Sequence, residues 1–213
     1  MIYFLKRHKG GLMAKILWKA GTMVYPAPAV MVSCGTMEKP NIITVAWTGT
    51  VCTDPAMTYI SVRKQRYSYD LIKQSGEFVI NLTTEYLVKE TDFCGVKSGR
   101  DHDKFKEMHL TPIAGSFVSA PMIKECPVSI ECRVTQVLEL GTHDMFLAEV
   151  LGVTIEDQFL DETGKFRLDH AGLMSYAHGT YYRLGEPLGT FGYSIMKKKT
   201  QQKREALKRK AKS

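Results

Sequence analysis

The chain has 213 residues, and its 44% hydrophobic composition is enough to bury a sizeable core in one globular domain. A formal net charge of +7 suggests nucleic-acid binding, but nine Lys or Arg residues against one Glu fall in Met196–Ser213. The other 195 residues carry a net charge of −1, which argues against a basic nucleic-acid-binding body. Residues 197–213 are predicted to form a solvated, disordered tail, with weak binding to phosphate polymers as the alternative.

The cysteine pattern and the N-terminal segment argue against two further classes. The five cysteines are odd in number and form no matched CxxC pairs, so neither a disulfide framework nor a zinc site is predicted. The apolar run in the opening MIYFLKRHKGGLM is about five residues long, too short for a signal peptide, and no segment approaches the roughly 20 apolar residues of a membrane span. We expect a cytoplasmic protein with no membrane partner. Residues 1–14 are predicted to be an extension, with Met13 as an alternative start, and residues 15–196 the domain.

The first predicted elements are strands. Val30–Ser33 is a short apolar run, and Asn41–Thr50 is rich in Ile, Thr, Val and Trp, residue types that favour a pleated sheet. Asp54-Pro55 indicates a turn, and Met57–Arg63 alternates as a half-buried strand would. The strands on either side of this turn are predicted to pair as a hairpin.

Short helices follow. Ser68–Gly76 has a hydroxyl at its start, an acid in its first turn and glycine at its end, which are helix start and stop signals. Glu77–Leu82 is predicted to be another strand. Thr84–Phe93 is predicted to be a helix closed by Gly95, and Ser98–His109 a loop that enters one helical turn.

The longest strand candidates lie in the second half of the chain. Pro127–Leu140 and Met145–Asp157 are predicted to form a long hairpin around the turn-like Gly141–Asp144. Many antiparallel strands with a few short helices indicate a mainly β fold, a β-barrel or a barrel derivative. Strands and helices do not alternate as in a doubly wound sheet, and no GxGxxG follows a strand, which argues against a Rossmann domain.

A basic corner is a candidate anion site. Arg63, Lys64 and Arg66 follow a predicted strand, and Ser68 stands where the next helix begins with free backbone N–H groups. The helix N-terminus, the hydroxyl and the guanidinium groups all complement a dianion such as phosphate. A solvated loop with a capping serine would give the same pattern, so the spacing alone leaves both interpretations open.

The stretch before this corner is suited to a flat ring. Ala46–Thr50 (AWTGT) offers small residues and one indole at a strand end, where a ring could lie close to the main chain. Flavin isoalloxazines bind in this manner, with polar edges on backbone groups and faces on apolar side chains. Taken alone, Trp47 is equally consistent with a core residue.

Seven stretches follow one another in order and without a large gap: GTMVYPAPAVMVSCG, NIITVAWTGTVCTDPAMTYISVRKQRYSYDLI, FVINL, DFCGVKSGRDHDKF, APMIKECPVSIECRV, GTHDMFLAEV and LGTFGYS. Through these stretches the chain resembles, from about Lys15 to Met196, the flavoredoxin subgroup of the flavin reductase-like, FMN-binding split-barrel proteins. The resemblance implies a split β-barrel homodimer that binds FMN noncovalently near the subunit interface and carries out flavin-dependent electron transfer or reduction.

The resemblance also implies which residues contact the cofactor. It places Asn41 and Trp47 beside the flavin, with main-chain contacts along its polar edge. The residues implied for the main-chain edge are Ala46, Trp47, Thr48, Gly49 and Thr50, and those for the phosphate segment are Arg63, Arg66 and Ser68. Relatives often have threonine where this chain has Ser68, and serine keeps the hydroxyl.

Further contacts come from later parts of the chain. Lys104 and His143 match positions near the cofactor, although taken alone Lys104 is equally a surface lysine and His143 a turn residue. Tyr176 matches an aromatic residue that covers a flavin face, for which Tyr181 is the alternative. The predicted set is completed by Ser61 and by Asn81, which ends a strand beside the barrel mouth. Cys94 is expected to be a buried structural thiol.

The resemblance and these residues together predict an NAD(P)H-dependent oxidoreductase. Bound FMN would pass electrons from NADH or NADPH to free flavin, a metal complex or a protein acceptor. No side chain is assigned a catalytic role, because the flavin carries the chemistry. Two alternatives stay open: a nonenzymatic FMN carrier or electron-transfer module, and a protein that associates with nucleic acid through its basic tail.

Overall fold

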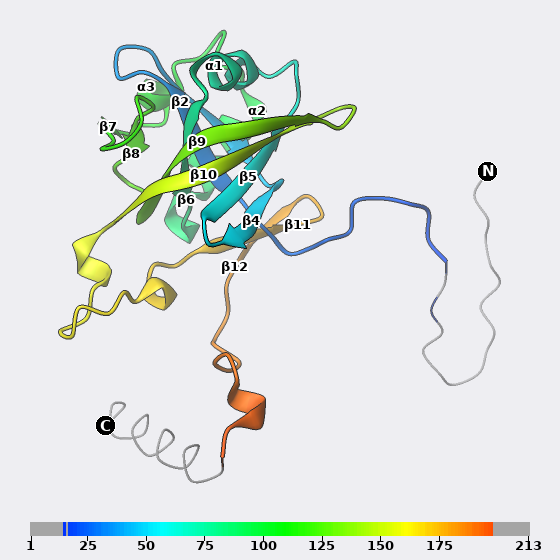
Figure 1. Cartoon of the computed structure of the whole chain (residues 1–213), viewed down its shortest axis with the longest axis vertical. Helices are drawn as coiled ribbons and strands as arrows, with labels where there is room; N and C mark the ends of the chain where they lie inside the picture. The colour runs from blue at the N-terminus through cyan, green and yellow to red at the C-terminus, as the bar shows by residue number, and fades with distance from the viewer. Residues whose placement is uncertain (1–14, 16, 198–213) are drawn as a thin grey trace.

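A seven-stranded antiparallel sheet forms the body of the protein in the computed structural model, which describes residues 15 and 17–197 (Figure 1). The predicted extension, residues 1–14, and residues 198–213 of the predicted tail lie outside the described residues. The strand order is β3-β2-β6-β9-β10-β5-β4. These strands are β2 (Val30–Gly35), β3 (Pro40–Val45), β4 (Thr48–Thr53), β5 (Ala56–Val62), β6 (Glu77–Leu82), β9 (Val128–Glu139) and β10 (Asp144–Ile155).

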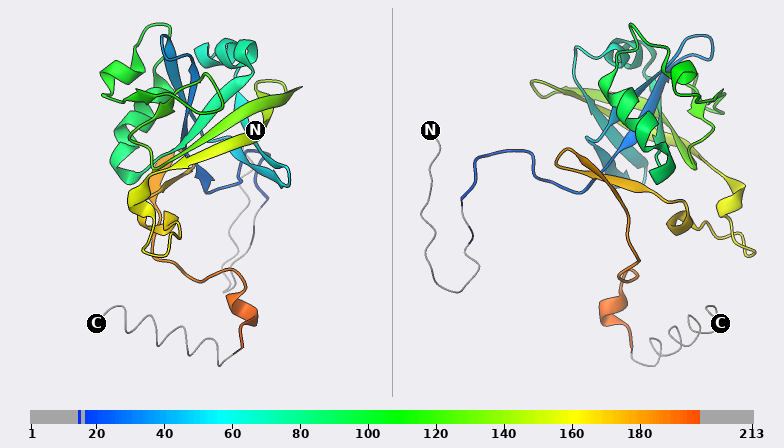
Figure 2. Two further views of the ribbon diagram at one scale, coloured as in Figure 1. Left: turned by 60° about the vertical axis from the view of Figure 1, so that its left-hand side comes forward. Right: turned by 180° about the vertical axis from the view of Figure 1, so that it is seen from behind.

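Short helices cover one end and one side of this sheet (Figure 1, Figure 2). The helices are α1 (Tyr67–Ser75), α2 (Val88–Val96) and α3 (Lys104–Glu107), with 3-10 turns at Glu85–Leu87, Asp157–Phe159, Leu168–His170 and Tyr193–Ile195. The predominance of strands confirms the predicted mainly β fold class. No described helix has the length and apolar character needed to cross a membrane.

Two smaller sheets contain strands that the sequence analysis did not predict. One sheet has the order β1-β11-β12, and the other pairs β7 with β8. Their bounds are β1 (Ala27–Pro28), β7 (Pro112–Ile113), β8 (Met122–Ile123), β11 (Met174–Ala177) and β12 (Thr180–Arg183). The loop between β11 and β12 is His178-Gly179, with φ values of 50° and 89°, the combination that a two-residue hairpin turn of type I′ requires.

The predicted strand Asn41–Thr50 is wrong as a single element. Ala46 and Trp47 interrupt it, so that β3 and β4 become separate strands at the two opposite edges of the sheet. Both halves have strand propensity, which is why the pattern did not reveal the break. The chain therefore crosses from one edge of the sheet to the other within two residues.

The helix boundaries also differ from the prediction. α1 begins at Tyr67 with Arg66 as its N-cap, so Ser68 lies inside the first turn and is not the cap. Gly76 ends this helix as predicted, in the left-handed region at φ 68°. The predicted helix Thr84–Phe93 is a 3-10 turn followed by α2, and Gly95 lies within α2 and does not close it.

The predicted long hairpin is confirmed as β9 and β10. Its strands have 12 residues each and are joined by a turn in which Gly141 has φ 93°. Two irregularities in their pairing, at Leu147/Ala148 and at Val150/Gly152, bend the hairpin around the body.

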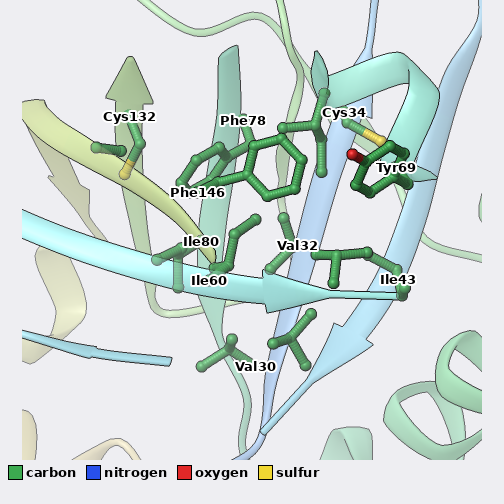
Figure 3. Packing of buried hydrophobic residues seen from close by; sticks show 14 residues of the cluster. Val30, Val32, Cys34, Ile43, Ile60, Tyr69, Phe78, Ile80, Cys132 and Phe146 are labelled. Atoms are coloured by element: carbon green, nitrogen blue, oxygen red, sulfur yellow. The ribbon is translucent and has the colours of Figure 1, made fainter. Parts of the chain in front are cut away.

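The main core fills the concave side of the sheet (Figure 3). Val30 and Val32 from β2, Ile60 from β5, Phe78 from β6 and Phe146 from β10 meet there and are almost fully buried. α1 closes one end of this cluster. The alternation of inward-facing apolar residues along each strand is what selects this face as the interior.

A second cluster lies on the other face of β2 and β3. Met31 and Ile42 pack there against Cys94 of α2 and Phe105 of α3. β2 is therefore buried on both faces, which explains its continuous apolar run in the sequence. The same packing fixes α2 and α3 beside the outer edge of β3.

The two ends of the sheet do not join through a strand ladder in the described residues, because β3 and β4 remain edge strands. The sheet nevertheless curls enough to bring β3 close to β5. We call the gap between β3 and the end of β5 the seam.

Candidate functional site

The main cavity lies along the seam and has a volume of about 500 Å³, within the roughly 300–1,000 Å³ usual for small-molecule sites. The end of β3, the Ala46–Trp47 crossover, the end of β5, one face of α2 and the β11–β12 hairpin form its walls. Its lining residues are Ala29, Ile43, Thr44, Val45, Ala46, Trp47, Ser61, Val62, Arg63, Arg66, Asp92, Gly95, Val96, His143, Tyr176, Gly179 and Tyr181.

Main-chain groups are available to a ligand along this cavity. β3 is an edge strand, so its outer N–H and C=O groups have no strand partner within the described part of the chain. At the crossover, the Ser61 N–H donates to the Trp47 carbonyl at 2.9 Å, which fixes the position of the crossover against β5. A planar ligand with polar edges would therefore find hydrogen-bonding backbone on one wall of the cavity.

Positive charge gathers at one end of the main cavity. Arg63 and Arg66 follow β5, and His143 reaches the same region from the β9–β10 turn. Burial, together with the positive charges of Arg63 and Arg66, lowers the pKa of His143 and favours its neutral imidazole. The Thr142 hydroxyl lies 2.9 Å from Nδ1 of His143, which orients the ring.

Trp47, Tyr176 and Tyr181 line another part of the main cavity, which we call the aromatic end, and Tyr25 contacts two of these rings without lining the cavity. Tyr25 lies 6.2 Å from both Trp47 and Tyr176 between ring centroids, and Tyr176 lies 5.6 Å from Tyr181. The Tyr181 hydroxyl donates to Oδ1 of Asp92 at 3.2 Å. Burial and this carboxylate raise the pKa of Tyr181 to about 12, so the hydroxyl keeps its proton at neutral pH.

A smaller cavity of about 130 Å³ continues from the cationic end, and we call it the phosphate pocket. It shares Ile43 and Arg66 with the main cavity. Its other lining residues are Gln65, Tyr67, Ser68, Lys97, Ser98, Gly99, Arg100 and Lys104. Four cations, two serine hydroxyls and the first turn of α1 therefore surround one small volume, a donor set that suits a phosphate group.

Lys104 is the buried cation of this pocket. The residue is only 4% exposed, and Nζ donates to the carbonyls of Ile42 at 2.7 Å and Cys94 at 2.9 Å. An ammonium has three N–H donors, so one remains for a ligand. Burial is the main cause that lowers the pKa of Lys104 below the ordinary lysine value, with Arg66 acting in the same direction.

Asn41 and Gly99 shape the wall behind the phosphate pocket. Nδ2 of Asn41 donates to the Ser68 hydroxyl oxygen at 2.7 Å, which leaves the Ser68 proton free to turn toward a ligand. A Cβ on Gly99 would lie 2.0 Å from Oδ1 of Asn41 and 2.8 Å from the Tyr67 ring. Only glycine lets the Ser98–Arg100 loop approach this closely.

The structure brings most of the predicted cofactor contacts together. Seven predicted residues line the main cavity: Ala46, Trp47, Ser61, Arg63, Arg66, His143 and Tyr176. Ser68 and Lys104 line the phosphate pocket, and Asn41 supports Ser68 from behind. Tyr181, the alternative to Tyr176, lines the main cavity as well.

Besides Asn41, four predicted residues do not line either cavity. Thr48, Gly49 and Thr50 belong to β4 and pair with β5, and the Thr48 hydroxyl donates to the Tyr59 carbonyl at 2.6 Å. Asn81 is fully buried inside the body. Its Nδ2 donates to the Met31 carbonyl and the Ser33 hydroxyl, and its Oδ1 accepts from the Ile123 N–H and the Ser129 hydroxyl. The amide of Asn81 therefore links its own strand, β6, to β2, β8 and β9 in the core.

Sequence reasoning missed Lys97 and Arg100 in the phosphate pocket and Asp92 in the main cavity. The stretch KSGR directly after α2 does carry a signal, since two cations flank a serine and a glycine. Its relation to Arg66 and Ser68, about 30 residues away along the chain, depends on tertiary packing and is not visible locally.

Comparisons with known proteins identify the family. Residues 22–185 match the family described as flavin reductase like domain. A protein of Archaeoglobus fulgidus is 34% identical over 156 residues, which cover 73% of this chain and 86% of that relative. An NADH-dependent FMN reductase of Streptomyces nodosus subsp. asukaensis is 28% identical over 126 residues, covering 59% of this chain and 66% of that protein.

A solved structure leads to the same family. The flavoredoxin of Desulfovibrio vulgaris (Miyazaki F) has a TM-score of 0.79 and 30% sequence identity to this chain. The match covers 86% of this chain and 100% of the flavoredoxin. Because the family match alone spans well over half of the sequence, the chain belongs to the flavin reductase-like family, and its body is a split-barrel fold.

Proposed function

We propose that the protein binds FMN and passes electrons from a reduced nicotinamide to free flavin, a metal complex or a protein acceptor. The observation that supports this most strongly is the continuity of the two cavities. A seam whose β3 edge has no strand partner among the described residues, and which has aromatic rings in its lining, adjoins a small pocket with four cations, one of them a lysine with an N–H left for a ligand. FMN has a planar ring with polar edges and a dianionic phosphate at its other end, so it matches both cavities.

The residues present fit this cofactor at both ends. The backbone of Ala46 and Trp47 and the outer edge of β3 would bind the polar edge of the ring system, and Tyr176 would cover one face. Arg66, Ser68 and Lys104 would bind the phosphate. Bound FMN supplies hydride acceptance from a nicotinamide and electron transfer to an acceptor.

The chain's own residues then act by orientation, charge and exclusion of water. The rings at the aromatic end shield the cavity from solvent, and protonated Tyr181 holds the Asp92 carboxylate against the wall. Arg63 and neutral His143 place positive charge and a hydrogen-bonding ring at the other end, where negative charge on a reduced flavin would be stabilised.

The choice of donor and the homodimer are part of the proposal. The similar Streptomyces protein is an NADH-dependent FMN reductase by name, and we extend a nicotinamide donor to this chain. The chain leaves the body in two extended segments, one toward each end of the described residues (Figure 2). Both segments carry exposed large apolar side chains, which support a second copy as partner. In the single chain Leu188 and Phe191 are fully exposed, and Leu17 and Val24 are more than 90% exposed. The five free thiols are consistent with a reducing cytoplasm.

An absorbance spectrum followed by anaerobic titration tests the proposal. Purified protein should carry or take up FMN at micromolar concentration, and NADH or NADPH should bleach the flavin absorbance. Steady-state oxidation of the nicotinamide with a free acceptor then separates an enzyme from a carrier. A carrier would be reduced once by the nicotinamide and would then show a negligible steady-state rate of nicotinamide oxidation. Protein that takes up no FMN would refute the proposal.

A further inference from the structure

A buried carboxylate, that of Asp144, lies next to the cationic end of the main cavity. Asp144 begins β10, immediately after His143, and pairs with Val62, the residue before Arg63. His143, Val62 and Arg63 all line the main cavity, whereas Asp144 lines neither that cavity nor the phosphate pocket. The Asp144 side chain is fully buried. Any effect of Asp144 on a ligand must therefore pass through its neighbours.

Asp144 contacts both chain segments that supply the proposed phosphate contacts. The Tyr69 hydroxyl donates to Oδ2 of Asp144 at 2.6 Å, and Nζ of Lys64 lies 3.5 Å from the same oxygen. Tyr69 follows Ser68 in α1, and Lys64 follows Arg63 in the link between β5 and α1. We call Asp144, Tyr69 and Lys64 the Asp144 cluster. It joins the start of β10 to α1 and to this link.

The Tyr69 side of the Asp144 cluster is held firmly. The Tyr69 ring packs edge-on against Phe146 in the main core, with 5.4 Å between the ring centroids (Figure 3). The hydrogen bond to Asp144, together with burial, raises the pKa of Tyr69, so its hydroxyl keeps the proton and remains the donor. The first turn of α1, which contains Ser68, is therefore fixed relative to β10.

Lys64 lines neither cavity, unlike its neighbours Arg63 and Arg66. Its Nζ lies 3.2 Å from Oε2 of Glu139, in addition to its contact with Asp144. Three cations so close in the chain repel one another, and the two carboxylates draw one of them away from the other two. The Asp144 cluster therefore helps to select which cations face the cavities.

The charge of Asp144 is poorly compensated for a buried group. Its Oδ1 is buried and has no hydrogen-bond partner in the part of the chain that the structure describes. The Lys64 contact of 3.5 Å is longer than the usual charge-assisted hydrogen bond. A buried charge with an unpaired oxygen destabilises a fold relative to a neutral group of the same size. Stability alone would favour asparagine at this position, so the carboxylate indicates a role in function.

We propose that Asp144 is a positioning residue for the phosphate of FMN. Through Tyr69 and Lys64 it holds the first turn of α1 and the Arg63–Arg66 segment in place before the cofactor binds. This inference rests on the proposed function. Donors that are already in place lose less conformational freedom on binding, which strengthens affinity. The charge of Asp144 alone would repel a dianion, so positioning and charge predict opposite effects on the Kd for FMN.

Titration of FMN and riboflavin into the full-length protein tests the proposal with two variants. Asp144→Asn keeps an acceptor oxygen for Tyr69 and removes the charge that holds Lys64, whereas Tyr69→Phe keeps the ring and removes the hydroxyl. Each variant should raise the Kd for FMN by about threefold or more and change the Kd for riboflavin, which lacks the phosphate, by less than about twofold. In urea titrations without ligand, the midpoint for Asp144→Asn should not fall below that of the wild type. Asp54→Asn, at an exposed position in the β4–β5 turn, is the matched control and should change none of these values.

Every other result overturns the proposal. Tighter binding of FMN by Asp144→Asn would show that Asp144 acts as a charge and not by positioning. An unchanged Kd for FMN in either variant would show that the Asp144 cluster does not position the site. Equal weakening of FMN and riboflavin, or a lower urea midpoint for Asp144→Asn, would assign Asp144 to the stability of the fold. A wild-type protein that binds no flavin would instead refute the proposed function, and this inference with it.

Discussion

Replacing Lys104 by methionine removes the buried ammonium from the phosphate pocket and keeps a side chain of similar length. In the wild type, Nζ donates to the carbonyls of Ile42 and Cys94 and leaves one N–H for the phosphate. A hydrogen bond to a charged group contributes about 1.5–3 kcal/mol. The Kd for FMN should therefore rise about 10- to 150-fold in Lys104→Met, since each 1.4 kcal/mol is about a factor of ten.

The same substitution changes stability in two opposing ways. The carbonyls of Ile42 and Cys94 lose a donor, which costs about 1–3 kcal/mol for each group left unsatisfied. The folded protein also no longer buries an ammonium, which offsets part of this cost. We expect the free energy of unfolding without ligand to fall by about 1–3 kcal/mol in urea titrations, so the variant should remain folded.

The pH dependence gives an independent signature. Burial lowers the pKa of Lys104 in the folded, ligand-free protein below its unfolded value. In the window between the two values the unfolded chain binds more protons, so the contribution of Lys104 to the free energy of unfolding rises with pH. Affinity for FMN should change in the opposite direction and fall as pH rises through the lowered pKa, because the phosphate needs the charged ammonium.

Riboflavin is the matched ligand in this assay, because it lacks the phosphate. Its Kd should change less than threefold in Lys104→Met and should not depend on pH in the same window. Lys106→Met, at an exposed position of α3, is the matched variant. It should leave the Kd for FMN, its pH dependence and the free energy of unfolding unchanged. If FMN and riboflavin weaken equally in Lys104→Met, then Lys104 acts through the fold and the assignment of the phosphate pocket is refuted.

Four further predictions concern other parts of the chain. Tyr176→Leu should weaken FMN and riboflavin by the same factor, about 2- to 10-fold, because the lost ring contact is independent of the phosphate; a change in FMN alone would contradict this. Asn81→Leu should lower the free energy of unfolding in urea by about 3 kcal/mol or more, because several buried partners lose their hydrogen bonds. The flavin affinity of the folded Asn81 variant should not change, and a large change would show that Asn81 contacts the cofactor after all. Gly99→Ala should weaken FMN at least tenfold and riboflavin much less, since its Cβ would lie 2.0 Å from Asn41 Oδ1 and would displace the phosphate-pocket loop; equal affinity for both would show that the loop is not needed. Deletion of Lys197–Ser213 should remove any salt-sensitive binding to nucleic acid and leave flavin titrations unaltered, and binding that survives the deletion would assign it to the body of the protein.

Strands with a clear local pattern could be predicted from the sequence. β5, β6 and the β9–β10 hairpin carry their own pattern of apolar residues, and turn residues delimit them. The break at Ala46–Trp47 could not be predicted, because both flanking segments favour strands and the separation of β3 from β4 depends on how the sheet curls. The two-residue strands β1, β7 and β8 exist only through their tertiary partners.

In the candidate site, too, some residues could be predicted from a local pattern and others depend on tertiary packing. The cluster Arg63, Arg66 and Ser68 is contiguous enough to suggest an anion site from spacing alone. The contribution of Lys97 and Arg100 requires the loop after α2 to pack against the start of α1, which no local pattern encodes. Ser68 illustrates a partial success, since its hydroxyl lies in the pocket although Arg66 is the helix cap.

The seam also affects how copies of this chain can meet. An edge strand with unpaired N–H and C=O groups is a template to which a strand from another molecule can add, and charge beside the edge or a short edge opposes this. β3 is six residues long and ends at the Ala46–Trp47 crossover, while Arg63 and Arg66 stand beside it. The residues that build the cavity thus also protect the protein against aggregation through its open edge.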